Sequence, residues 1–251
     1  MNITKYKIKA IPSHESVEEG EKIIKIAIES FGRIDVLINN AGILRDKSLN
    51  KLTINDWELV IRIHLNGSFK CLLAAWNYFK KQNYGRVINT GSSSGLFGNF
   101  GQINYSAAKS GIHGITMTAA KEGESFNIKV NTIAPIAATN MTQKLFSNEI
   151  LEAVNPKYVV PLVALLSHDS CPENGSIYEV GGGWVSKIRL QRSKGIGFPI
   201  DFTPEQLLEK WNEVIDFSNE CDYPTSGTDS IEKMLKNYEY QKNKIKKFPK
   251  I

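Results

Sequence analysis

Residues 86–109 read RVINTGSSSGLFGNFGQINYSAAK, and this stretch decides the fold. Arg86 to Thr90 is predicted to be a strand, Gly91 to Gly95 is a serine-rich loop, and Ile103 begins a helical segment. A strand followed by a loop and a helix is one step of an α/β fold. Ligands in such folds bind at the carboxyl ends of the strands, so this loop is the first candidate for a functional site.

The same step recurs on both sides of this stretch. Strands alternating with helices predict a Rossmann-like, doubly wound parallel sheet covered on both faces. The predicted strands are Tyr6–Ile11, Ile34–Ile38, Arg86–Thr90, Ile128–Ile133 and, as the last, Ile177–Val180. The predicted helices are Val17–Phe31, which stops at Gly32, Ile54–Gln82 and Ile103–Phe126.

The pattern weakens after about Lys187, which predicts an α/β domain over residues 1–190 and a C-terminal helical extension over 191–251. One amphipathic helix is expected to start at Thr203. The net charge of +5 is accounted for by the lysine-rich end, where residues 236–251 hold six lysines and Glu239. The body is therefore neutral, and nucleic acid is not an expected partner.

Composition points to a folded protein inside a cell. Hydrophobic residues make up 41% and charged residues 23%, no apolar run reaches membrane-spanning length, and the N-terminus lacks the apolar core of a signal peptide. The 3 cysteines lack both disulfide and metal-site spacing, so no metal is expected.

Tyr105 and Lys109 are the candidate chemical centre. Positions i and i+4 of a helix share a face, so the phenol and the ammonium can enter one pocket. A nearby cation favours the phenolate, and we expect Lys109 to lower the pKa of Tyr105. The spacing alone is weak, because Tyr238 with Lys242 repeats it, but only Tyr105 has a serine, Ser92, thirteen residues before it among these pairs.

Four motifs occur in the order of the short-chain dehydrogenase/reductase family, which the chain resembles. They are Asn39-Asn-Ala-Gly42, Ser92, Tyr105-x-x-x-Lys109 and Asn131-Thr-Ile-Ala-Pro135. Within that family, AGILRDKSL, HLNGSFK and YEVGGGW are similar to the (3R)-hydroxyacyl-CoA dehydrogenase units of peroxisomal multifunctional enzymes of type 2. The likeness runs from about Ser13 to Gly195.

The resemblance implies a role for each matched position. Tyr105 would be the general base, Lys109 would hold the cofactor ribose, and Ser92 would bind the substrate oxygen. Asn40, Ala41 and Gly42 would border the adenosine side of the cofactor. By alignment alone, Ser16 and Val17 would lie beside the adenine, and Ala137, Ala138, Thr139 and Asn140 beside the nicotinamide.

The sequence departs from the general family pattern at two places. His64 stands where most members carry an asparagine of a proton relay, so it is either a relay member or a packed helix histidine. No strand followed by Thr-Gly-x-x-x-Gly-x-Gly precedes the first helix, although that loop normally cradles the cofactor diphosphate. The sheet is therefore expected to lack the family's first two strands.

The resemblance implies an enzyme that oxidises (3R)-3-hydroxyacyl-CoA to 3-ketoacyl-CoA by hydride transfer to NAD in fatty-acid β-oxidation, as a homodimer without membrane insertion. NADP stays open, because the residue that reads the ribose 2′-position belongs to a missing strand. Two alternatives stay open as well: a catalytically impaired remnant that only binds or dimerises, and a dehydrogenase for steroid or acyl-carrier substrates. The resemblance implies a peroxisomal location, but Phe248-Pro-Lys-Ile251 is not a peroxisomal address, which leaves the cytoplasm as the alternative.

Overall fold

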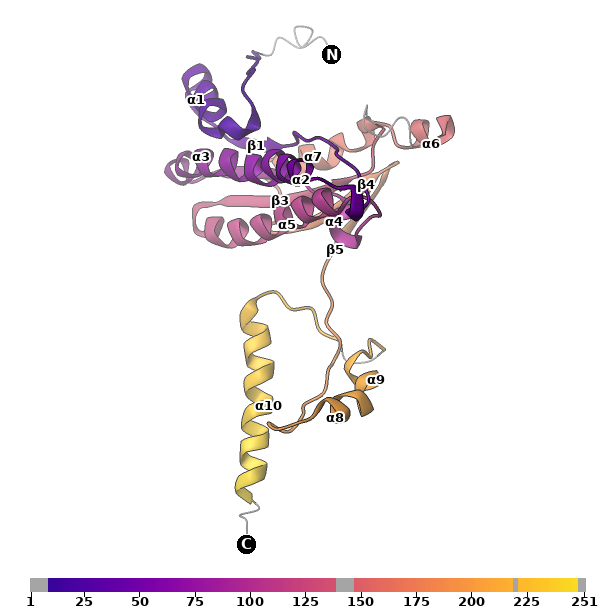
Figure 1. The fold of residues 1–251 in the computed structure, drawn as a ribbon. Coiled ribbons are helices and arrows are strands. Elements are labelled where there is room, and N and C mark those ends of the chain that lie inside the picture. The colour runs from indigo at the N-terminus through magenta and orange to yellow at the C-terminus, as the bar shows by residue number, and fades with distance from the viewer. Residues whose placement is uncertain (1–8, 139–146, 219–220, 248–251) are drawn as a thin grey trace. The chain divides into compact units, whose positions relative to one another are not determined.

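The chain forms two compact units in a computed structural model that describes residues 9–138, 147–218 and 221–247 (Figure 1). The first unit ends at Ile188 and the second begins at Arg189, two residues before the boundary expected from the sequence. The first unit contains the sheet and every described residue of the predicted site.

A five-stranded sheet forms the centre of the first unit, in the order β1-β2-β3-β4-β5. Its strands are β1 Val36–Asn39, β2 Gly85–Thr90, β3 Ile128–Pro135, β4 Ile177–Gly181 and β5 Trp184–Ile188. The first four run parallel, and β5 returns antiparallel to β4. The predicted parallel α/β sheet is confirmed.

Two of the strand predictions are wrong. The strand predicted last, Ile177–Val180, is followed by β5, and the reversal is made at Gly182 and Gly183, whose φ values of 57° and 83° suit glycine. At the other end, Lys9 to Ile11 carry no strand, and the rest of the strand predicted at Tyr6–Ile11 lies outside the described residues. Within the described residues β1 is therefore an outer strand, paired only with β2.

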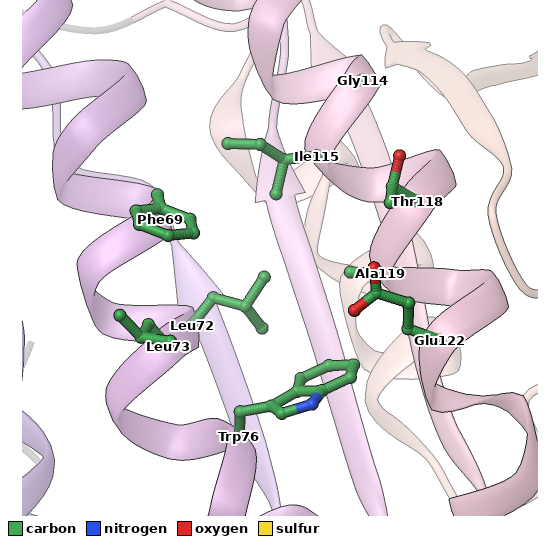
Figure 2. Close-up of a pocket in the computed structure, with 9 residues that line it drawn as sticks. All are labelled: Phe69, Leu72, Leu73, Trp76, Gly114, Ile115, Thr118, Ala119 and Glu122. Carbon is green, nitrogen blue, oxygen red and sulfur yellow. The ribbon is translucent and has the colours of Figure 1, made fainter.

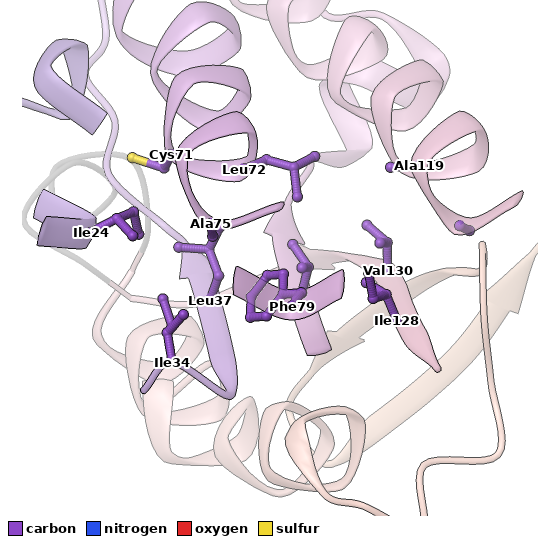
Figure 3. Packing of buried hydrophobic residues seen from close by; sticks show 12 residues of the cluster. Ile24, Ile34, Leu37, Cys71, Leu72, Ala75, Phe79, Ala119, Ile128 and Val130 are labelled. Atoms are coloured by element: carbon purple, nitrogen blue, oxygen red, sulfur yellow. The ribbon is translucent and has the colours of Figure 1, made fainter. Parts of the chain in front are cut away.

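Helices cover both faces of the sheet. On one face lie α1 Gly20–Phe31, α3 Gly67–Gln82 and α5 Ile103–Gly123. Figure 3 shows the core beneath them, in which Leu72 and Phe79 of α3 meet Leu37 of β1 and Val130 of β3. On the other face, α7 Val160–Ser167 packs Leu162 and Leu166 against the sheet.

The predicted helix Ile54–Gln82 is confirmed as a nearly continuous one with a change of winding in its middle. Helix α2 covers Ile54–Ile61, a π-helical turn covers Arg62–Asn66, and α3 follows. Single π-turns inside helices are often found at functional sites, because they turn a side chain that regular winding would direct elsewhere. Here the π-turn carries His64.

The stretch Glu149–Ser167 is apolar enough to be a membrane-span candidate by length and composition, with a mean hydropathy of 1.3. In the fold it is divided into α6 Asn148–Ala153, a 3₁₀ turn Pro156–Tyr158 and α7. Two of its apolar side chains, Leu162 and Leu166, are buried against the sheet.

The second unit contains three helices in its described residues: α8 Pro204–Glu209, α9 Trp211–Val214 and α10 Gly227–Lys247. Helix α8 begins as predicted, with Thr203 and Gln206 forming a reciprocal capping box. The predicted C-terminal helical extension is confirmed, and most of the lysine-rich end belongs to α10, which is helical over 21 residues.

Candidate active site

Buried polar side chains join the ends of three strands to α5. The register pairs Asn39 with Asn89 and Asn89 with Thr132. Asn39 Nδ2 donates to Asn89 Oδ1 at 2.9 Å, and Asn89 Nδ2 donates to Thr116 Oγ1 of α5 at 2.9 Å. Thr116 in turn contacts Thr132 Oγ1 at 2.7 Å. These bonds fix the height of α5 on the sheet and thereby the position of the residues one to three turns earlier on that helix.

Asn104 fixes the start of α5, and the sequence did not single it out. The side chain is fully buried; its Oδ1 accepts from the backbone N–H of Tyr105 at 2.8 Å. Its Nδ2 donates to the carbonyls of Arg45 and Asp56 at 3.1 and 3.3 Å. The loop after β1 and helix α2 are thus tied to the residue beside Tyr105. No pattern in the sequence marks this residue, because Ser106 is also polar within the first turn of the helix.

Lys109 is buried at the end of β2. It is 3% exposed, and its Nζ donates to the carbonyl of Thr90 at 2.5 Å. The same nitrogen lies 5.5 Å from the centroid of the Tyr105 ring. Burial lowers the pKa of Lys109 to about 8.

The expected effect of Lys109 on Tyr105 is not found. Burial raises the pKa of Tyr105 above its ordinary value, a hydrogen bond with Ser92 opposes the rise, and the charge of Asp46 adds to it. The physical reason is the placement of the ammonium, which is held on Thr90 and faces the ring of Tyr105. In this state the phenol is favoured over the phenolate.

Ser92 follows β2, and its side chain makes two contacts within the site; its binding of the substrate oxygen stays a prediction. Its Oγ accepts from the N–H of Ser94 at 3.2 Å and so caps the short helix α4 Ser93–Phe97. Its side chain also hydrogen-bonds Tyr105. The hydrogen bond from the Ser94 N–H holds the Ser92 hydroxyl beside Tyr105.

His64 lies against Tyr105. The two rings meet edge to face with centroids 5.1 Å apart, and His64 is 2% exposed. Its Nε2 lies 3.0 Å from the N–H and 2.8 Å from the carbonyl oxygen of Ile43. Burial, followed by the charge of Lys109, lowers the pKa of His64 to about 4, so the ring is neutral at physiological pH. His64 is therefore packed within the helix layer and also lies in contact with Tyr105. Its role in a proton relay stays a prediction.

The predicted cofactor loop also reaches this place. Asn40 Oδ1 accepts from Thr90 Oγ1 at 3.1 Å, next to the carbonyl that holds Lys109. Gly42 lies on the His64 ring so closely that a Cβ there would come within 2.3 Å of Cε1. A side chain on Gly42 is excluded, and Ala41 lies between these two contacts in the chain.

The remaining predicted cofactor residues lie around this centre with less direct evidence. Ser16 caps the 3₁₀ turn Val17–Glu19, and this turn packs against the π-turn that carries His64. Ala138 donates its N–H to the carbonyl of Val154 at 2.7 Å, and Ala137 precedes it after β3. Thr139 and Asn140 lie outside the described residues.

Comparisons with known proteins give one consistent result. The family model for short chain dehydrogenases matches residues 10–150. The chain is 50% identical over 226 residues to peroxisomal multifunctional enzyme A of Dictyostelium discoideum, covering 90% of this chain and 51% of that protein. It is 54% identical over 226 residues to the peroxisomal hydratase-dehydrogenase-epimerase of Neurospora crassa, covering 89% of this chain and 25% of that protein.

Solved structures agree with the sequence matches. The full-length peroxisomal multifunctional enzyme type 2 of Drosophila melanogaster superposes with a TM-score of 0.83 at 39% identity, over 95% of this chain and 42% of that one. A short chain dehydrogenase from Mycobacterium avium superposes with a TM-score of 0.73 at 34% identity, over 85% of this chain and 76% of that one. The chain spans between a quarter and a half of the length of these two curated relatives.

Proposed function

We propose, from the premise that this chain belongs to the short-chain dehydrogenase family, that it oxidises the (3R)-hydroxyl group of 3-hydroxyacyl-CoA to a ketone with NAD as the hydride acceptor. The convergence of Ser92, Tyr105 and Lys109 at the carboxyl end of β2 supports this proposal above all else. The names of the relatives, peroxisomal multifunctional enzyme and peroxisomal hydratase-dehydrogenase-epimerase, support a dehydrogenase. The substrate class is taken from the sequence motifs that resemble (3R)-hydroxyacyl-CoA dehydrogenase units.

The roles proposed for Ser92 and Tyr105 follow from the hydrogen bonds and protons that their hydroxyl groups can give and take. The Ser92 hydroxyl can donate to a ketone oxygen or accept from an alcohol, so it can bind substrate and product alike. Tyr105, hydrogen-bonded to Ser92, takes the hydroxyl proton in oxidation and returns it in reduction. Its raised pKa favours the protonated form, so oxidation should become faster with rising pH and reduction with falling pH.

The ribose side of a dinucleotide fits the residues that are present. The buried ammonium of Lys109 has three N–H donors, one of which is used by the Thr90 carbonyl, and the exposed Asn40 accepts from the hydroxyl of the same Thr90. When bound, NAD supplies the acceptor for the hydride that leaves C3 of the substrate. Lys109 and Asn40 are thus the residues that would hold the ribose side of the cofactor.

Stereochemistry tests the proposal. With NAD in excess, the purified chain should reduce NAD with (3R)-3-hydroxyacyl-CoA and not with the (3S) isomer, because one face of the substrate must meet Tyr105. The measurement is NADH absorbance, repeated with NADP, with a steroid alcohol and with a 3-hydroxyacyl group on the acyl carrier protein. Turnover of the (3S) isomer alone, or of the steroid alone, would contradict the assignment of the substrate.

A peroxisomal role in fatty-acid β-oxidation belongs to the same proposal. The relatives from Dictyostelium discoideum and Neurospora crassa are both named peroxisomal. Two fluorescent fusions, one at the N-terminus and one at the C-terminus, would leave the opposite end free and show the compartment directly. Exclusively cytoplasmic signal from both fusions would favour the alternative location.

The proposed partner is a second copy of the chain, docked on α3 and α5. An apolar hollow of about 360 Å³ lies between the two helices. Figure 2 shows that Phe69, Leu73 and Trp76 of α3 face Ile115 and Ala119 of α5 across it. Phe69 is 49% and Leu73 58% exposed, a costly arrangement for a face that meets only water. Members of this family commonly pair through these two helices, and a paired copy would cover the hollow.

Substitution of Leu73 by Glu should therefore convert a dimer into a monomer, because two carboxylates would be buried in a symmetric interface. The measurement is molar mass by sedimentation equilibrium. Leu165→Glu is the matched control, since Leu165 is 49% exposed on α7, on the opposite face of the sheet. A wild-type monomer, or a Leu73→Glu dimer, would exclude this face.

The outer strand favours a second candidate function, a dehydrogenase remnant that binds a partner without turnover. Ile38 of β1 is 47% exposed, and β1 pairs only with β2 in the described part of the chain. An uncovered strand edge presents unpaired N–H and C=O groups that can pair with another chain. Calorimetric titration with NAD separates the two candidates: a dimer without measurable NAD binding would favour the remnant.

A further inference from the structure

His113 continues the line of site residues along α5. It follows Lys109 by four residues, as Lys109 follows Tyr105, so the three side chains project from one face of the helix in successive turns. The proposed chemistry uses the first two. The third is as well placed as the second to act on the site, because neighbouring turns lie about 5–6 Å apart.

The burial of His113 calls for a physical explanation. The ring is 6% exposed, and neither Nδ1 nor Nε2 meets a hydrogen-bond partner among the described residues. A neutral imidazole carries one donor and one acceptor, and a buried polar atom without a partner costs about 1–3 kcal/mol. Such groups in native proteins usually bind an ordered water or serve the site beside them.

Gly91 connects the His113 ring to the residues that hold the site. A Cβ on Gly91 would come within 2.6 Å of His113 Cε1 and 2.7 Å of Thr132 Cγ2, so the ring lies directly against the backbone there. Gly91 stands between Thr90, whose carbonyl accepts from Lys109, and Ser92, which hydrogen-bonds Tyr105. The imidazole thus lies one peptide from both anchoring points.

The electrostatic surroundings of His113 are simple. Burial, followed by the charge of Lys109, lowers the pKa of His113 to about 4, and no carboxylate contributes to that shift. His64, on the π-turn, responds to the same ammonium and is also neutral. Tyr105, on α5 itself, stays a neutral phenol, and Thr132 of β3 is uncharged. Lys109 is therefore the charge that both buried imidazoles sense.

We propose that His113 is a positioning residue for the site, and that its neutral ring binds one water molecule that accepts a hydrogen bond from the Lys109 ammonium. The water donates to the acceptor nitrogen of the imidazole and so gives one of its two ring nitrogens a partner. It also gives the ammonium a second acceptor besides Thr90, which stabilises the charged form of Lys109. The inference rests on the proposed site, but its test does not depend on turnover.

Nitrogen NMR on the full chain with ¹⁵N-labelled histidine tests the proposal. The chain has 4 histidines, and His113→Gln assigns the signal of interest. We expect His113 to stay neutral at pH 6 and its ring-nitrogen shifts to step near pH 8, where Lys109 loses its proton. Lys109→Met should abolish that step. His168, exposed and bonded to Ser170, is the internal control, whose signal should be the same in the wild type and in Lys109→Met. Protonation of His113 between pH 6 and 7, or shifts without a step near pH 8, would overturn the proposal.

A pair of variants separates positioning from packing, with His64 as the reporter of Lys109. His113→Leu keeps the volume but removes the acceptor, so the step sensed by His64 should move to lower pH by about one unit, the effect of one hydrogen bond to a charged group. His113→Gln keeps an acceptor and should leave the step in place. Equal midpoints in the two variants would reduce His113 to a packing residue. If His113→Leu does not fold, the comparison of wild type with Lys109→Met still decides.

Discussion

Replacement of Tyr105 by Phe should lower the kcat/KM for hydroxyacyl oxidation by about 10²- to 10⁴-fold, the usual contribution of a general base. The ring and its contact with His64 are kept, so the loss reports the hydroxyl alone. KM should change little, because the phenolic oxygen acts in the transition state more than in binding. The measurement is the rate of NADH formation with the (3R) substrate.

The pH dependence of the wild type adds a second requirement. Since the pKa of Tyr105 lies above its ordinary value, the phenolate is a small fraction at neutral pH, and oxidation should rise as pH increases through the range 7 to 9. Reduction of the ketone should show the opposite trend. Binding of cofactor or substrate that brings Lys109 closer to the phenol would move this rise to lower pH.

Tyr238→Phe is the matched control for this experiment. Tyr238 and Lys242 have the same spacing on α10 as Tyr105 and Lys109 on α5, but they lie in the second unit. The control should retain full activity. Undiminished turnover in Tyr105→Phe would refute the assignment of the base, and parallel loss in Tyr238→Phe would point to a general effect on folding.

The parts of the fold that the sequence predicts well are those whose local pattern and tertiary role agree. The helix expected over Ile54–Gln82 begins and ends at those residues, and the strand expected at Arg86–Thr90 forms one residue longer, from Gly85 to Thr90. Gly32 ends α1 with a φ of 77°, which a glycine adopts readily. In these elements propensity, capping and burial all favour the same structure.

Elements were missed where composition hides the pattern. β5 follows three glycines, and its residues Trp184 and Val185 are half exposed, so no buried run marks it as a strand. α10 is dominated by polar and charged residues, so its bounds were not predicted. Its apolar positions Ile231, Met234, Leu235 and Tyr238 nevertheless recur at helical spacing, and this periodicity was the available evidence.

The residues of the candidate site could be predicted from the sequence, but their orientations could not. Motif order identified Ser92, Tyr105 and Lys109, and the structure brings them together. The orientation of Lys109 toward Thr90 depends on the end of β2, nineteen residues away in sequence, and so could not be read from helical spacing. The same holds for His113 and Asn104, whose surroundings are formed by separate strands and loops.

Replacement of Lys109 by Met should make the protein more stable at neutral pH while it removes activity. The pKa of Lys109 falls from 10.5 to about 8 on folding, so the unfolded state binds more protons between these two values. Stability therefore rises with pH across that window, and the penalty for burying the charge is fully present below pH 8. At about 1.4 kcal/mol per pKa unit the penalty is about 3 kcal/mol.

Methionine has a similar length and carries no charge. It leaves the Thr90 carbonyl without its partner, and this loss offsets part of the increase in the free energy of unfolding. We therefore expect Lys109→Met to raise the free energy of unfolding by about 1–2 kcal/mol at pH 7 and to lose this advantage by pH 10. Urea unfolding at the two pH values measures the difference, and Lys51→Met, at an exposed lysine, should show no such change. A variant that is less stable than the wild type at pH 7 would mean that the ammonium contributes more to the fold than its burial costs. The buried cation at the centre of the site would then be a structural element first, and a loss of activity in Lys109→Met would no longer identify its chemical role.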